Sequence, residues 1–132
     1  MLRREFPLPE EDADHLATTG LSWETATENN IRRVIIRGFP VPDGYNHNHV
    51  VLNVRIEAAY PDTQIDMVYF YPPLARIDGK PIAATVDDPF EGKPWQRWSR
   101  HRTGQNPWRP GLDNLASHLA LVREWLNMEL RK

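Results

Sequence analysis

The sequence contains no cysteine. This absence excludes disulfide bonds, thiolate–metal sites, thiol redox reactions and any intermediate held as a thioester on this chain. No stretch approaches the roughly 18 apolar residues that a bilayer-spanning helix requires. The first residues, MLRREFPLPEED, combine charges with prolines and acids instead of forming an apolar leader. We therefore expect a cytoplasmic protein without a membrane partner.

The chain also has no excess of basic residues. Its formal net charge is −2 and its isoelectric point lies near 6.2, whereas proteins that bind nucleic acid non-specifically usually carry a strong positive charge. Nucleic acid is therefore not the expected main partner. Apolar residues make up 40% of the 132 residues and charged residues 26%, which is typical of a globular domain with its own core. We expect one domain over 1–132.

The two ends of the chain carry helical patterns. The segment PEEDADHLATTG places acids in the first turn of a short helix and a glycine just after its end. Beyond the last proline, Pro110, apolar residues recur at helical spacing in LDNLASHLALVREWLNMELRK. Asp113 is the expected N-cap of this C-terminal amphipathic helix. His15 and His118 fall on these helices, where we expect surface or half-buried positions.

The middle of the chain carries strand patterns. Apolar and polar residues alternate in VVLNVRIEA, as expected for a strand with one face on the core. The segments IRRVIIRGF and MVYFY indicate neighbouring strands on either side. Asp78-Gly79 suggests a hairpin turn that leads into a short edge strand, PIAATV. Together these patterns predict an α+β fold with an antiparallel meander of about four strands.

Residues 86–110 are rich in Pro, Gly, Arg and Trp, and we expect a long irregular loop there. Long loops without regular structure are uncommon in compact domains unless they serve a function. Two readings remain open, because the tryptophans could either bind a partner or pin the loop onto the core under a cover of arginines. The residues of the partner-binding reading are Trp95, Arg97, Trp98, Arg100 and Trp108.

The same region holds the residue types of several catalytic or metal sites. Ser99, His101 and Asp113 supply the members of a hydrolase triad, but no glycine-flanked nucleophile turn accompanies them. His101 alone is a more credible acid–base residue, because neighbouring arginines favour its neutral form. His47 and His49 lie two residues apart and, with His101, make an alternative metal or ligand site; they are otherwise ordinary turn residues. No cofactor is expected.

The order of these segments resembles the ubiquitin-conjugating (UBC) superfamily, and above all its prokaryotic family E. The likeness covers nearly the whole chain. The motifs that carry it are Tyr60-Pro61, Tyr71-Pro72-Pro73-Leu74, Trp95-Gln96-Arg97-Trp98-Ser99-Arg100-His101, Trp108 and Pro110-Gly111-Leu112-Asp113. The resemblance implies a UBC-like fold, in which an N-terminal helix precedes the meander and an active-site loop runs towards later helices. It also implies a bacterial modification pathway, with a ubiquitin-like protein and an activating-enzyme-like protein as partners.

This sequence departs from that resemblance at the nucleophile. A conjugating enzyme holds its cargo as a thioester on cysteine, so thioester transfer through this chain is chemically excluded. Three explanations stay open: a non-catalytic adaptor that docks the ubiquitin-like protein or its activating enzyme, acyl transfer through Ser99 or with the help of His101, and replacement of an original cysteine. We favour the adaptor, because Ser99 has no evident base other than His101 and an unactivated hydroxyl is a poor nucleophile.

Overall fold

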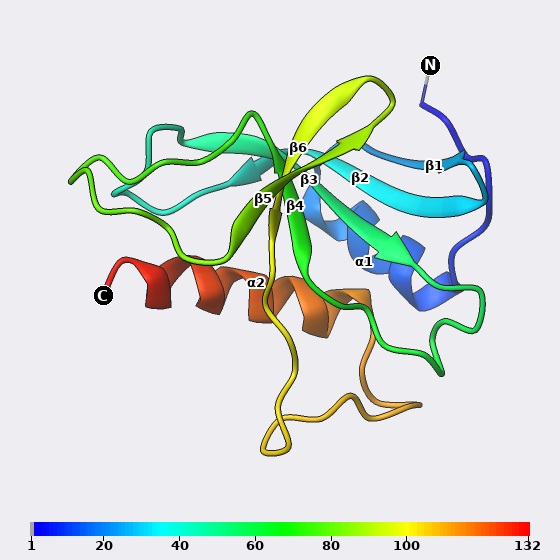
Figure 1. Cartoon of the computed structure of the whole chain (residues 1–132). Helices are drawn as coiled ribbons and strands as arrows, with labels where there is room; N and C mark the ends of the chain where they lie inside the picture. The colour runs from blue at the N-terminus through cyan, green and yellow to red at the C-terminus, as the bar shows by residue number, and fades with distance from the viewer. Residues whose placement is uncertain (1) are drawn as a thin grey trace.

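A computed structural model describes residues 2–132 and contains two helices and one six-stranded sheet (Figure 1). The predicted α+β class is confirmed. The sheet is antiparallel throughout, with the strand order β1-β2-β3-β4-β6-β5. In chain order the elements are α1 (Glu10–Thr19), β1 (Trp23–Glu28), β2 (Ile31–Pro40), β3 (His49–Ile56), β4 (Val68–Tyr71), β5 (Thr85–Phe90), β6 (Lys93–Trp98) and α2 (Leu115–Glu129).

Both helices form where local signals place them. Helix α1 has three acids in its first turn and ends at Gly20, whose φ of 73° is the left-handed conformation that glycine adopts freely. Helix α2 begins one residue later than expected, because Asn114 and not Asp113 is its N-cap. The Asn114 side chain accepts from the Ser117 backbone N–H, and the Ser117 hydroxyl accepts from the Asn114 backbone N–H. This reciprocal cap fixes the direction from which the chain enters α2.

The sheet contains a strand, β1, and a hairpin, β5–β6, that the sequence patterns did not predict. Strand β1 pairs with β2 through an Asn29-Asn30 turn, and β5 pairs with β6 through a Glu91-Gly92 turn. All four turn residues have positive φ, as type I′ turns of two-residue hairpins require. The expected hairpin at Asp78-Gly79 is wrong: the chain turns there, but residues 81–84 of PIAATV form no strand and β5 starts only at Thr85.

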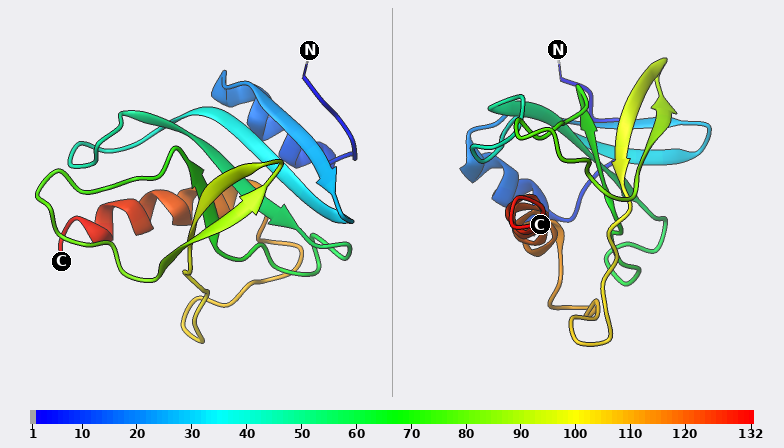
Figure 2. Two further views of the ribbon diagram at one scale, coloured as in Figure 1. Left: turned by 45° about the horizontal axis from the view of Figure 1, so that its top comes forward. Right: turned by 60° about the vertical axis from the view of Figure 1, so that its left-hand side comes forward.

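The two faces of the sheet have different coverings. Both helices lie on one face, as the two views in Figure 2 show. The main core fills the space between them and the sheet, and its buried residues include Leu16 of α1, Leu52 of β3, Phe70 of β4, Trp98 of β6 and Leu119 of α2. A smaller apolar cluster lies on the other face, which we call the outer face, and consists of Ala26, Ile35, Tyr69, Phe90 and Trp95.

Candidate functional site

The segment that joins β6 to α2, residues 99–114, projects from the body of the protein (Figures 1 and 2). We call it the connecting loop. Its tip is a tight turn in which the Asn106 N–H donates to the Thr103 carbonyl, and residues 103–107 are all exposed. Such a loop keeps a defined shape only if contacts within its base, or from its base to the body, hold it in place. Three sets of contacts do so.

The first contact joins His101 to Asp66. The imidazole Nδ1 lies 3.0 Å from both carboxylate oxygens of Asp66. Strands β4 and β6 create this proximity, because their antiparallel pairing continues beyond the strands and the Met67 N–H donates to the Arg100 carbonyl at 3.2 Å. The His101 side chain is 61% exposed, and its Nε2 has no hydrogen-bond partner within residues 2–132. An imidazole oriented in this way can accept a proton from solvent or from a bound molecule.

The second contact is a buried ion pair that joins the two ends of the loop to each other. The Asp113 carboxylate accepts from the Arg109 backbone N–H at 2.8 Å and lies 3.6 Å from the Arg102 guanidinium, and both paired side chains are buried. Burial by itself raises the pKa of Asp113, but the Arg109 N–H, Ser117 and the two arginines more than offset it, so the pKa lies below its ordinary value. Asp113 is therefore a charged anchor at neutral pH.

The third contact comes from Trp108. Its indole N–H donates to the Pro61 carbonyl at 3.0 Å, and its ring packs against Tyr60. The Arg102 guanidinium lies 5.0 Å above the same ring, which links this contact to the buried ion pair. Trp108 is half-buried. Its buried part therefore holds the loop in place, and its exposed part belongs to the surface of the loop.

Two side chains near the end of the loop point outward. Leu112 is 68% exposed, and the Arg109 side chain is 62% exposed. Leu112 is the first apolar residue of the segment with helical spacing, but it lies outside the helix, because α2 begins at Leu115. An exposed leucine and arginine on a preformed loop are the kind of groups that protein partners contact.

The structure does not assemble the triad suggested by residue type. His101 binds Asp66 instead of Asp113, and the Asp113 carboxylate is occupied by the two arginines. Ser99 donates its backbone N–H to the Ala84 carbonyl, while its hydroxyl has no hydrogen-bond partner in the described part of the chain. Ser99 therefore lacks a base, and the grouping of Ser99, His101 and Asp113 is corrected to a His101–Asp66 pair.

Most of the tryptophans and arginines expected at a partner surface lie elsewhere. Trp98 is completely buried in the main core, and Trp95 is buried in the outer-face cluster. Arg97 pairs with Asp88 of the neighbouring strand. The Arg100 side chain, only 16% exposed, turns back towards Glu129 of α2. The alternative reading, in which these residues pin the segment to the core, is correct for both tryptophans, because residues 93–98 form a strand and not a loop.

The alternative metal site is also corrected. His47 lies in the segment before β3, His49 is the first residue of β3, and His101 pairs with Asp66 beyond the far end of β6. Within residues 2–132, no three His, Asp or Glu side chains are grouped so that they could hold a metal ion. Neither of the two described helices is both long and apolar enough to cross a bilayer.

Two residues that the sequence reading did not assign lie next to the site. Asp66 is one, and its position could be inferred only after the pairing of β4 with β6 was known. The other is His118 of α2, which is completely buried, contrary to expectation, and whose Nε2 donates to the Met67 carbonyl at 2.8 Å. Burial, with a smaller contribution from Arg102, lowers the pKa of His118 to about 4. It is therefore a neutral donor that joins α2 to the start of β4.

Comparison with known proteins identifies a family. The sequence model of the family described as prokaryotic E2 family E matches residues 8–129. This range includes both helices, all six strands and the whole connecting loop. No curated protein and no solved structure matches the chain significantly.

Proposed function

The chain belongs to prokaryotic E2 family E, and from this premise we propose that it is a ubiquitin-conjugating-like protein that docks a ubiquitin-like protein or its activating-enzyme-like partner without forming a thioester. The connecting loop is the proposed docking surface. The observation that carries the proposal is that this loop is fixed at its base by three sets of contacts while Arg109 and Leu112 remain exposed.

A loop that is already ordered has an energetic advantage in binding. Ordering a flexible segment on association costs conformational entropy, and a loop held in one shape avoids most of that cost. The Asp113–Arg102 pair and the Trp108 hydrogen bond hold the connecting loop in the free protein. These contacts favour recognition of a folded partner by a fixed surface.

The charge of the segment indicates the kind of partner surface that fits it. Every charged side chain in residues 97–112 is basic. The side chains of the other arginines in this segment are at most 35% exposed, whereas that of Arg109 is 62% exposed. Although its Nε lies 3.6 Å from Asp113, Arg109 therefore presents its charge to solvent most openly. We therefore expect a partner with an acidic patch beside a shallow apolar one, which would contact Arg109 and Leu112 together.

Titration with a ubiquitin-like protein from the same organism tests the docking role. Leu112→Ser and Arg109→Glu should each weaken binding about tenfold in isothermal titration calorimetry, as expected for residues near the centre of an interface. Ile77→Ser is a matched control, because Ile77 is 73% exposed and lies beside Arg76, which contacts the opposite end of α2. Equal affinities for all three variants and the wild type would refute the proposed surface.

The His101–Asp66 pair favours a second candidate function, assistance to acyl transfer between two other proteins. In such a step the amine of an acceptor lysine attacks the acyl carbon of a thioester held on the partner. The C–N bond forms, the C–S bond breaks to release thiolate, and His101 Nε2 accepts the amine proton. Asp66 would orient the ring and stabilise the imidazolium that forms.

Single-turnover transfer from the charged activating enzyme to lysine separates the two candidates. If His101 acts as a base, His101→Gln should lower the rate about 100-fold without weakening docking. An unchanged rate would leave docking as the function. A covalent adduct on this chain that hydroxylamine cleaves would instead assign an acyl-accepting role to a hydroxyl group such as that of Ser99.

A further inference from the structure

The outer face of the sheet contains a cleft of about 220 Å³ that lies between the β5–β6 hairpin and strands β2 and β3. Its apolar walls are Ile35, Val51, Phe90 and Trp95, and Tyr71 lies beside them. Three of these residues, Ile35, Phe90 and Trp95, belong to the buried outer-face cluster, so packing fixes the positions of these apolar walls. An apolar side chain that entered this space would lose its contact with water.

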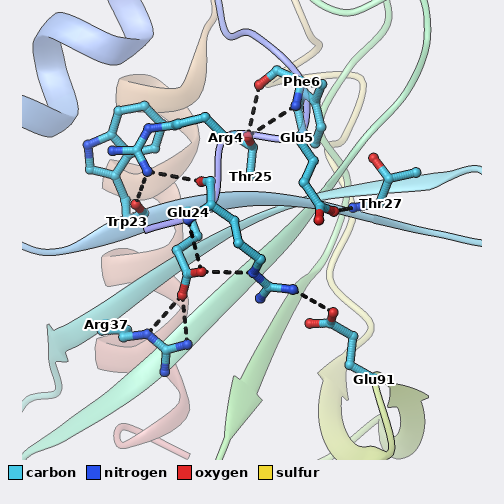
Figure 3. A network of polar contacts seen from close by, with 10 residues as sticks. Arg4, Glu5, Phe6, Trp23, Glu24, Thr25, Thr27, Arg37 and Glu91 are labelled. Atoms are coloured by element: carbon cyan, nitrogen blue, oxygen red, sulfur yellow. Dashed lines mark hydrogen bonds and ion pairs between the residues drawn. The ribbon is translucent and has the colours of Figure 1, made fainter. Parts of the chain in front are cut away.

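Cationic groups line the rim of the same cleft. Glu24 of β1 holds two of them, because its carboxylate lies 2.8 Å from the Arg3 Nε and 2.8 Å from the Arg37 Nη2. Arg3 also reaches the hairpin turn, where its Nη1 lies 2.6 Å from Glu91. Figure 3 shows Glu24 beside Arg37 and places Glu91 on the neighbouring hairpin. The hydrogen bond from Arg3, opposed by burial and reinforced by Arg37, lowers the pKa of Glu24 to about 2.

These contacts leave hydrogen-bond donors free at the rim. Within residues 2–132, Arg3 Nη2, Arg37 Nη1 and Lys93 Nζ have no hydrogen-bond or ion-pair partner. Lys93 lies 5.3 Å from the centroid of the Tyr71 ring, at the edge of the apolar walls. Donors from three separate segments beside an apolar lining match a ligand that combines a carboxylate with a hydrophobic group.

We infer that this cleft is a binding site for a carboxylate that bears a single aromatic or branched aliphatic group. The carboxylate would bind the free donors of Arg37 and Lys93, and the apolar group would contact Val51 and Trp95. A volume of about 220 Å³ is smaller than the roughly 300–1,000 Å³ of sites for drug-sized molecules, which limits the buried group to about one side chain. A free amino-acid-like acid and the C-terminal residue of a polypeptide both present this chemistry.

The inference does not rest on the proposed docking role. Lys93 is the first residue of β6, whereas the connecting loop follows Trp98 at the other end of the same strand. The cleft also lies on the sheet face opposite the helices. Loss of ligand binding at the cleft and loss of partner binding at the loop can therefore be measured separately.

NMR titration of the ¹⁵N-labelled protein with N-acetylphenylalanine tests the site. Saturable shift changes should appear at β2, β3 and β6, with a dissociation constant on the order of 1 mM, as expected for a ligand of about 15 heavy atoms. N-acetylphenylalaninamide, which has the same ring and no carboxylate, should bind at least about fivefold more weakly. Equal binding of acid and amide, or no binding by either, would overturn the inference.

Variants locate the binding and identify the source of the ligand. Lys93→Gln should weaken binding of the acid about fivefold, while the exposed control Lys80→Gln should not. Val51→Trp should fill the cleft and abolish binding without a loss of dispersed amide signals; binding unchanged in this folded variant would overturn the inference. A peptide ending in phenylalanine should bind as well as the free acid if the natural ligand is a chain end, whereas binding of the acid alone assigns a small free molecule.

Discussion

Protonation of His118 should destabilise the folded protein between pH 6.5 and pH 4. The imidazole is completely buried and donates to the Met67 carbonyl, and its pKa falls from 6.5 to about 4 on folding. Below pH 6.5, His118 therefore binds a proton in the unfolded chain but stays neutral in the folded chain. The free energy of unfolding consequently decreases as the pH falls through this range. The loss between pH 7 and pH 5 is about 2 kcal/mol, and it approaches about 3 kcal/mol near pH 4.

Urea unfolding at pH 7, 6 and 5, followed by tryptophan fluorescence, measures this loss. With an ordinary urea dependence, a loss of about 2 kcal/mol lowers the midpoint by about 1 M. Glu24 and Asp113 have lowered pKa values, so the stability that they contribute is lost only below pH 4.5, outside the measured range. The raised pKa of Asp12, caused mainly by burial, acts in the opposite direction, because the folded state then binds its proton more readily.

His118→Gln is the matched variant. Glutamine can still donate to the Met67 carbonyl and has no charge to gain. Its stability at pH 7 should be lower because the ring's contact with Trp125 is lost, but the change between pH 7 and pH 5 should nearly disappear. A wild-type midpoint that is constant over this range, or an equal decrease in the variant, would refute the argument that His118 is held neutral by burial.

Two further predictions concern stability at neutral pH. Asp12 accepts from the Tyr60 hydroxyl and from the first backbone N–H of α2, so Asp12→Ala should cost about 3 kcal/mol and Tyr60→Phe about half of that in urea unfolding; equal costs would show that the helix contact contributes nothing. Gly44 has a φ of +119°, and a Cβ there would lie 2.9 Å from Leu130, so Gly44→Ala should cost about 2 kcal/mol, whereas Gly104→Ala, with no atom within 4 Å of its Cβ, should change stability by less than about 0.5 kcal/mol.

The helices and the central strands could be predicted because their signals are local. Acids before a helix, a glycine after it, periodic leucines and alternating strand residues act within a few positions of one another. Strand β1 was missed because its sequence, WETATE, is polar. Glu24 is buried there only because Arg3 and Arg37 neutralise it from other parts of the chain. No local pattern carries that information.

The β5–β6 hairpin was missed because prolines argue against strands. Pro89 and Pro94 lie opposite each other, one pair beyond the hydrogen-bonded pair that flanks the two-residue turn. Because hydrogen-bonded and non-hydrogen-bonded pairs alternate along an antiparallel ladder, neither proline has to donate a hydrogen bond. Strand β5 is also at the edge of the sheet, and β4 pairs with β6 only at residues 96–98, beyond Pro94. The same error hid the His101–Asp66 contact, which depends on the pairing of β4 with β6.

Strand β4 has a mechanical consequence for the whole molecule. Only Val68–Tyr71 joins the β1–β3 ribbon to the β5–β6 ribbon within the sheet, through three residue pairs on each side. A pull applied to residues just after Trp98 is transmitted along β6 and reaches the rest of the sheet across this short strand. Amide hydrogen exchange at Tyr69 and Phe70 should therefore slow when the connecting loop is immobilised. The exchange rates of these two amides would then report on binding at the loop, although neither residue belongs to it.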